Sequence, residues 1–157
     1  MQRAIAHFNA ACWPSEQATD GVTLAFDERH RRRIRLRTDK GEEILLDLPK
    51  AMAMAHGDGL RTSDGRWLAV RAAPEPLLEI RCITPVALQR MAWHLGNRHL
   101  PTDIAADRLR IRPDHVIKAM ARALGAHVEA ITAPFQPEGG AYDEQGGGHS
   151  HEHEHGH

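Results

Sequence analysis

The chain has 157 residues, 41% of them hydrophobic, which is enough for a packed core in one domain or in two small ones. A formal net charge of −1 gives no overall field that favours nucleic acid or a membrane surface, and no apolar run approaches the ~20 residues of a transmembrane helix. Two distant cysteines exclude a disulfide scaffold and a zinc ribbon, and the N-terminus lacks the apolar core of a secretion signal, so we expect a cytoplasmic protein.

The first half of the chain predicts a series of short, half-buried strands. Three stretches alternate apolar and polar residues with period two, and their inward sets are Val22, Leu24 and Phe26; Ile34 and Leu36; and Ile44, Leu46 and Leu48. Ser63-Asp64-Gly65 predicts a hairpin turn before a further strand over residues 66–72. We therefore expect a small β domain over residues 1–73, followed by a stiff connector at Pro74 and Pro76.

A strand and a helix are predicted next. Residues 77–83 place Leu78, Ile80 and Cys82 on one face, so Cys82 is expected in the core. Thr84 suits the N-cap of a helix, and Pro85 suits its first position. The apolar face of this helix consists of Leu88, Met91, Ala92 and Leu95. Gly96 and Asn97 both tolerate a left-handed conformation, so the helix is predicted to end there.

A second unit of strand, helix and strand follows. Residues 108–112 alternate with Leu109 and Ile111 inward, and Asp114 is suited to cap a helix. The apolar residues of that helix are Ile117, Met120, Ala121 and Leu124, with Gly125 as its stop. A strand over residues 127–132 closes the unit. This order predicts an α+β fold, with a ferredoxin-like βαββαβ domain over residues 76–140 behind the β domain.

Histidine is concentrated at the C-terminus. Residues 141–157 contain four acidic residues and no Lys or Arg, which predicts a flexible, disordered tail. Five of the twelve histidines of the chain lie there, namely His149, His151, His153, His155 and His157. Imidazole is a ligand for nickel, zinc and copper, and histidines two residues apart on a flexible chain can converge on one ion. Two other interpretations are an expression tag and a merely solvated polar segment.

Two histidines outside the tail are further metal-ligand candidates. The predicted helix end at Gly96 turns His99 out onto the adjoining loop, although His and Arg at a helix C-terminus also serve to offset its dipole. His115 lies in the first turn of the second helix, where the positive end of the dipole favours the neutral imidazole that a metal needs. Its other interpretation is a simple polar residue. The basic run at residues 28–37 is typical of the solvent-exposed face of a strand, so nucleic-acid binding is not expected.

Several longer motifs carry a resemblance to a known family. They are GDGL at residues 57–60, WHLGNRHLP at 93–101, DHV at 114–116, LGA at 124–126 and PFQPEGGAY at 134–142. With these motifs the chain resembles the urease accessory protein E family, the nickel metallochaperones for urease. The resemblance implies a β domain similar to chaperone peptide-binding domains, followed by a ferredoxin-like domain that forms homodimers. It also implies that His99 of two subunits faces one Ni(II) ion across a two-fold axis, with tail histidines completing the coordination.

The resemblance further implies the urease accessory GTPase and apo-urease as partners. Some family members carry His-x-His near the start of the second helix, whereas this chain has Pro113 and then His115, so only half of that motif is present. We expect a non-enzymatic carrier that captures Ni(II), with Zn(II) and Cu(II) as competing ions. The alternatives are a histidine-rich metal buffer without a dedicated client, a peptide-binding co-chaperone and, ranked last, a metalloenzyme.

Overall fold

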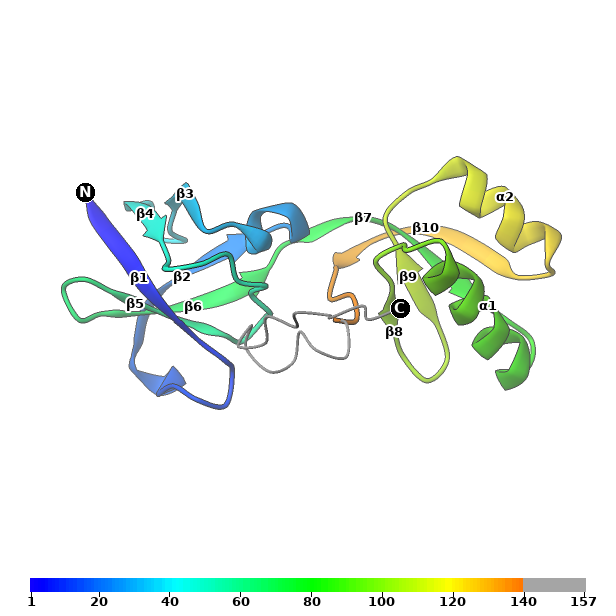
Figure 1. Cartoon of the computed structure of the whole chain (residues 1–157), viewed down its shortest axis with the longest axis horizontal. Coiled ribbons are helices and arrows are strands. Elements are labelled where there is room, and N and C mark those ends of the chain that lie inside the picture. Colours follow the sequence, from blue (N-terminus) through cyan, green and yellow to red (C-terminus); the bar gives the residue numbers. More distant parts are fainter. Residues whose placement is uncertain (140–157) are drawn as a thin grey trace, which may run out of the picture.

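The computed structural model describes residues 1–139, which form two β sheets and two α-helices. The first sheet has six strands in the order β2-β6-β5-β1-β4-β3 (Figure 1). Its strands are β1 Gln2–Phe8, β2 Ala18–Leu24, β3 Arg33–Arg37, β4 Glu43–Asp47, β5 Gly59–Thr62 and β6 Trp67–Ala72. Two short 3-10 helices, η1 (Ser15–Gln17) and η2 (Phe26–His30), lie between these strands.

In β3 and β4, the residues buried in the core of the first sheet are those that the period-two pattern predicted. Leu36, Ile44 and Leu46 are buried, while the arginines that alternate with them along β3 are exposed. The turn at Ser63-Asp64-Gly65 joins β5 to β6, and Gly65 has a φ of 89° there. The prediction that the strand containing Val22 and Leu24 extends to Phe26 is wrong: β2 ends at Leu24 and Phe26 begins η2.

The second sheet belongs to a ferredoxin-like unit, as predicted from the order of its elements. Its four strands lie in the order β10-β7-β9-β8, and every neighbouring pair is antiparallel. The elements are β7 Pro74–Arg81, α1 Pro85–Asn97, β8 Asp103–Ile104, β9 Leu109–Ile111, α2 His115–Ala123 and β10 His127–Pro134. In Figure 1, β7 runs from the end of the first sheet into the second and pairs with β10 along its length.

The core of this unit lies between the sheet and the apolar faces of both helices. It consists of Leu78, Ile80, Leu88, Met91, Leu95, Leu109, Ile111, Ile117, Ala121 and Val128, with Cys82 partly buried against it. Gly125, at a φ of 91°, ends α2 as predicted. Leu124 was expected on the apolar face but is 53% exposed, because α2 already ends at Ala123. Neither helix of residues 1–139 is long and apolar enough to cross a membrane.

The start of α2 allows a direct test of the local structure. The Asp114 carboxylate accepts hydrogen bonds from the backbone N–H groups of Val116 (3.0 Å) and Ile117 (3.1 Å). Asp114→Ala leaves both groups without this partner, so we expect it to lower the free energy of unfolding by about 1 kcal/mol, measured by urea denaturation. Asp114→Asn keeps the capping oxygen and should lose only a fraction of this; equal losses for both variants would contradict the role of the cap.

Contacts between the two units gather around η2. The Arg112 guanidinium, just beyond β9, forms an ion pair with Asp27 at 2.9 Å and lies 5.0 Å from the centroid of the Phe26 ring. The ring of Phe26 also packs against Phe135, with the centroids 5.3 Å apart. Arg29 is 2% exposed, so the prediction that residues 28–37 form the solvent-exposed face of a strand is wrong at this position. These contacts fix the wall of the N-terminal unit that faces the second one.

Candidate metal centre

Helix α1 positions the first candidate ligand, His99. The helix begins as predicted, with the Thr84 hydroxyl accepting a hydrogen bond from the N–H of Ala87 at 3.1 Å and Pro85 at the first position. Its end differs from the prediction. The helix continues through Gly96 to Asn97, and Arg98 is the C-cap. The residue that leaves the helix in the left-handed conformation is therefore not glycine.

His99 adopts the left-handed conformation, with a φ of 57°, and is the only non-glycine residue among residues 1–139 with a positive φ. Its N–H donates to the Gly96 carbonyl at 3.0 Å, and the N–H of Leu100 donates to the Leu95 carbonyl at 3.2 Å. These two bonds define a Schellman motif, in which the left-handed position is usually occupied by glycine. Histidine at this position costs about 1 kcal/mol, and such a cost is typical of functional sites.

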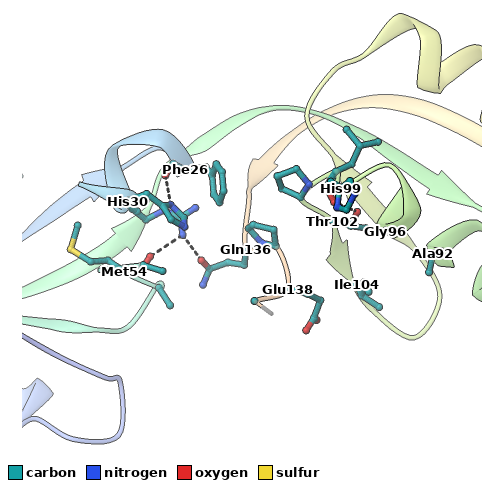
Figure 2. A pocket seen from close by; sticks show the side chains of 17 residues that line it. Phe26, His30, Met54, Ala92, Gly96, His99, Thr102, Ile104, Gln136 and Glu138 are labelled. Carbon is teal, nitrogen blue, oxygen red and sulfur yellow. Dashed lines mark hydrogen bonds between the residues drawn. The ribbon is translucent and has the colours of Figure 1, made fainter. Parts of the chain in front are cut away.

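His99 lines a groove of about 680 Å³ between the two units. Figure 2 shows His99 on the wall from the ferredoxin-like unit and His30 and Met54 on the opposite wall, with Gln136 and Glu138 between them. The segment from Gln136 to Glu138 is held to the ferredoxin-like unit by two backbone hydrogen bonds. The Gln136 N–H donates to the Asp103 carboxylate at 3.1 Å, and the Glu138 N–H donates to the Thr102 carbonyl at 2.8 Å.

His30 and Glu138 are potential ligands in this groove that the sequence analysis missed. The ring nitrogen Nδ1 of His30 lies 3.1 Å from the Phe26 carbonyl, an arrangement in which Nδ1–H donates and leaves Nε2 free. His30 falls inside a basic run with no periodic signal of its own. Glu138 belongs to the PFQPEGGAY motif, which was the one available signal for it.

The predicted site residues are not all brought together. His115 is the first residue of α2, exposed, and does not line the groove that contains His99. The five predicted ligands His149, His151, His153, His155 and His157, and the predicted disordered tail as a whole, lie outside the described residues. Within residues 1–139, no three or more His, Cys, Asp and Glu side chains lie close enough together to hold a metal ion. Residues 1–139 therefore provide an open set of donors too small to hold an ion.

A cationic side chain lies beneath the groove. Burial lowers the pKa of the Arg29 guanidinium, and the charges of Glu75 and Asp58 oppose that shift.

The donors that line the groove are the imidazoles of His30 and His99 and the carboxylate of Glu138, and these groups suit Ni(II), Zn(II) and Cu(II). Structural metal sites retain their ion because four protein ligands enclose it. An exposed imidazole such as that of His99 leaves a bound ion accessible, which favours its exchange.

Fold and site together define a two-domain α+β protein whose ferredoxin-like domain presents an exposed imidazole beside an open groove. Comparison with known families refines this class. The model of the UreE urease accessory protein, N-terminal domain, matches residues 2–73, and that of its C-terminal domain matches residues 75–157. The chain belongs to the UreE urease accessory protein family.

Individual relatives agree with this assignment. A urease accessory protein UreE of Bradyrhizobium sp. strain ORS 278 is 58% identical over 134 residues, which cover 85% of this chain and 64% of the relative. The chain thus spans slightly less than two thirds of that relative's length. A UreE of Chelativorans sp. strain BNC1 is 54% identical over 136 residues, covering 86% of each chain. A UreE of Agrobacterium fabrum strain C58 is 45% identical over 143 residues, covering 91% of this chain and 89% of the relative.

Proposed function

We propose that this protein is a nickel metallochaperone that captures Ni(II) in the cytoplasm and delivers it to the urease maturation complex. The observation that carries the proposal is His99, an exposed imidazole held in a costly left-handed conformation at the edge of an open groove. The relatives are named urease accessory proteins, which supports urease as the destination of the metal. The protein is a carrier, and its metal is cargo for ligand exchange with the urease accessory GTPase and apo-urease.

The second part of the proposal is a homodimer built on the ferredoxin-like domain, in which His99 of two protomers binds one ion. In a two-fold interface a residue near the axis contributes twice, which supplies imidazoles that one protomer lacks. The surface around His99 has the character such an interface needs. Trp93 is 65% exposed on α1, and Ile104 is 46% exposed at the groove. Exposed apolar side chains that form a contiguous patch are typical of interaction surfaces, and the proposed dimer requires Trp93 and Ile104 to belong to such a patch.

Gly96 supports the same interface. It lies in the last turn of α1, three residues from Trp93, and a Cβ atom added there would meet nothing within 4 Å in the protomer. Glycine in a helix costs about 0.5–1 kcal/mol relative to alanine, and no contact within residues 1–139 explains it. A second copy of the chain that approaches the helix closely at this point would explain the glycine.

Gly96→Ala is therefore expected to separate protomer stability from dimerisation. The free energy of unfolding of the protomer should rise by about 0.5–1 kcal/mol in urea denaturation, because the helix gains a better helix former. Self-association, measured by analytical ultracentrifugation, should weaken. Arg90→Ala, on the same helix beside a different cavity, is the control and should leave self-association unchanged. Unchanged self-association of Gly96→Ala would contradict the proposed interface.

Tail histidines and His115 complete the proposal as ligands that load the shared site. His149, His151, His153, His155 and His157 would capture ions and pass them to the His99 pair, and His115 would serve as an additional weak site. Protons compete with metal for the imidazole lone pair, so nickel affinity should fall as the pH is lowered.

The functional test is restoration of urease activity at limiting nickel in a urease-producing bacterium from which its own UreE gene has been deleted. The full chain should restore activity, and His99→Gly should not. The second candidate function, a metal buffer without a dedicated client, is favoured by the five histidines within the last nine residues. A buffer would bind nickel yet leave urease activity unchanged at every nickel concentration, and this result would overturn the proposed delivery.

A further inference from the structure

A second cavity, of about 470 Å³, lies in the ferredoxin-like domain on the other flank of α1 from the His99 groove. Ala92 and Gly96 of this helix line the groove together with His99, whereas Arg90 and His94, each two residues earlier, line the second cavity. Residues two apart on an α-helix point in roughly opposite directions. In Figure 1, the end of α2 and the start of β10, which border this cavity region, lie at the end of the molecule away from the N-terminal domain.

The cavity has an apolar lining and an open mouth. The lining includes buried Met91 and half-buried Cys82, and burial raises the pKa of the Cys82 thiol, which therefore stays uncharged. At the mouth, Ile83 is 95% exposed and Leu124 is 53% exposed. Ile83 also lines an adjoining cavity of about 430 Å³. Exposed apolar side chains that surround one cavity form a contiguous patch, and such a patch is typical of an interaction site.

The charged groups at this cavity are cationic. Arg90 is exposed at the cavity and forms no hydrogen bond or ion pair with any described residue, and the His94 imidazole lies one helical turn further on. In the adjoining cavity, by contrast, Arg81 is paired with Glu79 and Asp107. No carboxylate of residues 1–139 lines either cavity. A carboxylate for Arg90 would therefore have to come from outside the described part of the chain.

This positive charge extends over the helical layer of the domain. Neither α1 nor α2 contains an Asp or Glu residue, and their Lys and Arg residues are Arg90, Lys118 and Arg122. None of these three side chains forms an ion pair with a described residue. Because the whole chain has a formal net charge of −1, the excess is local to this surface. A cationic surface attracts an acidic one and orients it during association.

We propose that the second cavity is a docking site for a partner protein that presents an acidic segment with exposed apolar side chains. An apolar side chain of the partner would fill the cavity beside Ile83, and a carboxylate would pair with Arg90. The open mouth suits side chains on a protein surface, because pockets for free small molecules enclose most of the ligand. The inference is independent of nickel and of His99, and both sites can be occupied together.

Binding of a model segment by the full chain in metal-free buffer tests the proposal. The probe is a short, fluorescently labelled synthetic peptide of leucine and glutamate with helical spacing, and its affinity is measured by fluorescence anisotropy. Backbone amide NMR shifts should locate the peptide at residues 82–94 and leave His99 unaffected. Arg90→Glu and Ile83→Ser should each weaken binding by about tenfold, because the first places like charges together and the second removes an apolar contact.

Two matched controls make the same chemical changes on the helical layer outside the site. Lys118→Glu reverses a charge of α2, and Val116→Ser removes an apolar side chain of α2 that is 63% exposed. Neither residue lines either cavity, so both variants should keep nearly the full affinity for the peptide. Peptides with serine in place of leucine, or with lysine in place of glutamate, should bind much more weakly than the original peptide.

The other outcomes contradict the proposal. Absence of peptide binding, or NMR shifts that gather elsewhere, would exclude the site. An equal loss in Lys118→Glu and Arg90→Glu would mean that the charge of the surface acts without a specific cavity. Displacement of the peptide by decanoate or by single-stranded DNA would point to another class of ligand. Loss of self-association in Ile83→Ser, measured by analytical ultracentrifugation, would mean that a second copy of the chain covers this surface.

Discussion

Replacing His99 with glycine is expected to lower the affinity of the tight nickel site by about 100-fold or more. Loss of a residue that merely supports a metal ligand costs 10–100-fold, so loss of the ligand itself lies at or beyond the upper end. The same substitution should raise the free energy of unfolding by about 1 kcal/mol, because glycine suits the left-handed position that His99 occupies at a φ of 57°. Calorimetric titration and urea denaturation in metal-free buffer measure the two effects.

The opposite signs of these effects make the experiment informative. A damaged fold cannot explain lost nickel binding in a variant that is more stable than the natural chain. His127→Ala is the matched control, since His127 is exposed at the start of β10 and does not line the groove. Full nickel affinity in His99→Gly would exclude His99 as a ligand. A loss of affinity in His127→Ala as large as in His99→Gly would exclude a specific site.

Replacing all five tail histidines with alanine is expected to remove most of the nickel ions that the chain binds. Imidazole is the side chain of that segment best suited to nickel, and only acidic side chains remain as charged donors after the change. The tight site should persist with one ion shared by two chains, weakened because the tail no longer completes its coordination. Equilibrium dialysis with nickel gives the number of ions for each variant.

The tail experiment also separates a carrier from a buffer. Replacing Glu152 and Glu154 with glutamine, which keeps the histidines, is the matched control and should preserve most of the bound ions. If tight nickel binding disappears with the tail histidines, the tail is the principal nickel site, as expected for a metal buffer. If the number of ions does not change, the tail does not bind nickel.

The parts of the fold that the sequence predicted are those in which a local pattern coincides with burial. In β3 and β4, every second residue faces the core, so Leu36, Ile44 and Leu46 reveal both strands. The Thr84 and Asp114 caps mark the helix starts, because their side chains bond to backbone groups only a few residues away. The order of these elements was then sufficient for the ferredoxin-like topology.

Other features depend on contacts that a local pattern does not contain. β1 was not recognised as an individual strand because Ala4 is its only fully buried residue, so the strand carries almost no periodic signal. The end of α1 is determined by Leu100, which returns to the core that contains Leu95, and not by the glycine within the helix. The left-handed conformation therefore falls on His99 instead of on Gly96, which leaves the candidate site in place but changes its geometry.

Burial of Arg29 shows the same limit over a longer range. The residues that follow it, His30 to Arg33, are basic and exposed, so the local pattern indicates a solvated face. Its hydrogen-bond partner Phe135 lies 106 residues further along the chain. Only the folded arrangement of both domains brings the two together, and the groove that contains His30, His99 and Glu138 arises in the same way.

The most direct test of the central claim is a crystal structure of the nickel-loaded chain, with diffraction collected at the nickel absorption edge. We predict an anomalous peak on a two-fold axis, within bonding distance of the His99 imidazoles of two protomers. A nickel ion bound elsewhere, with His99 enclosed in a single protomer and free of metal, would contradict the account.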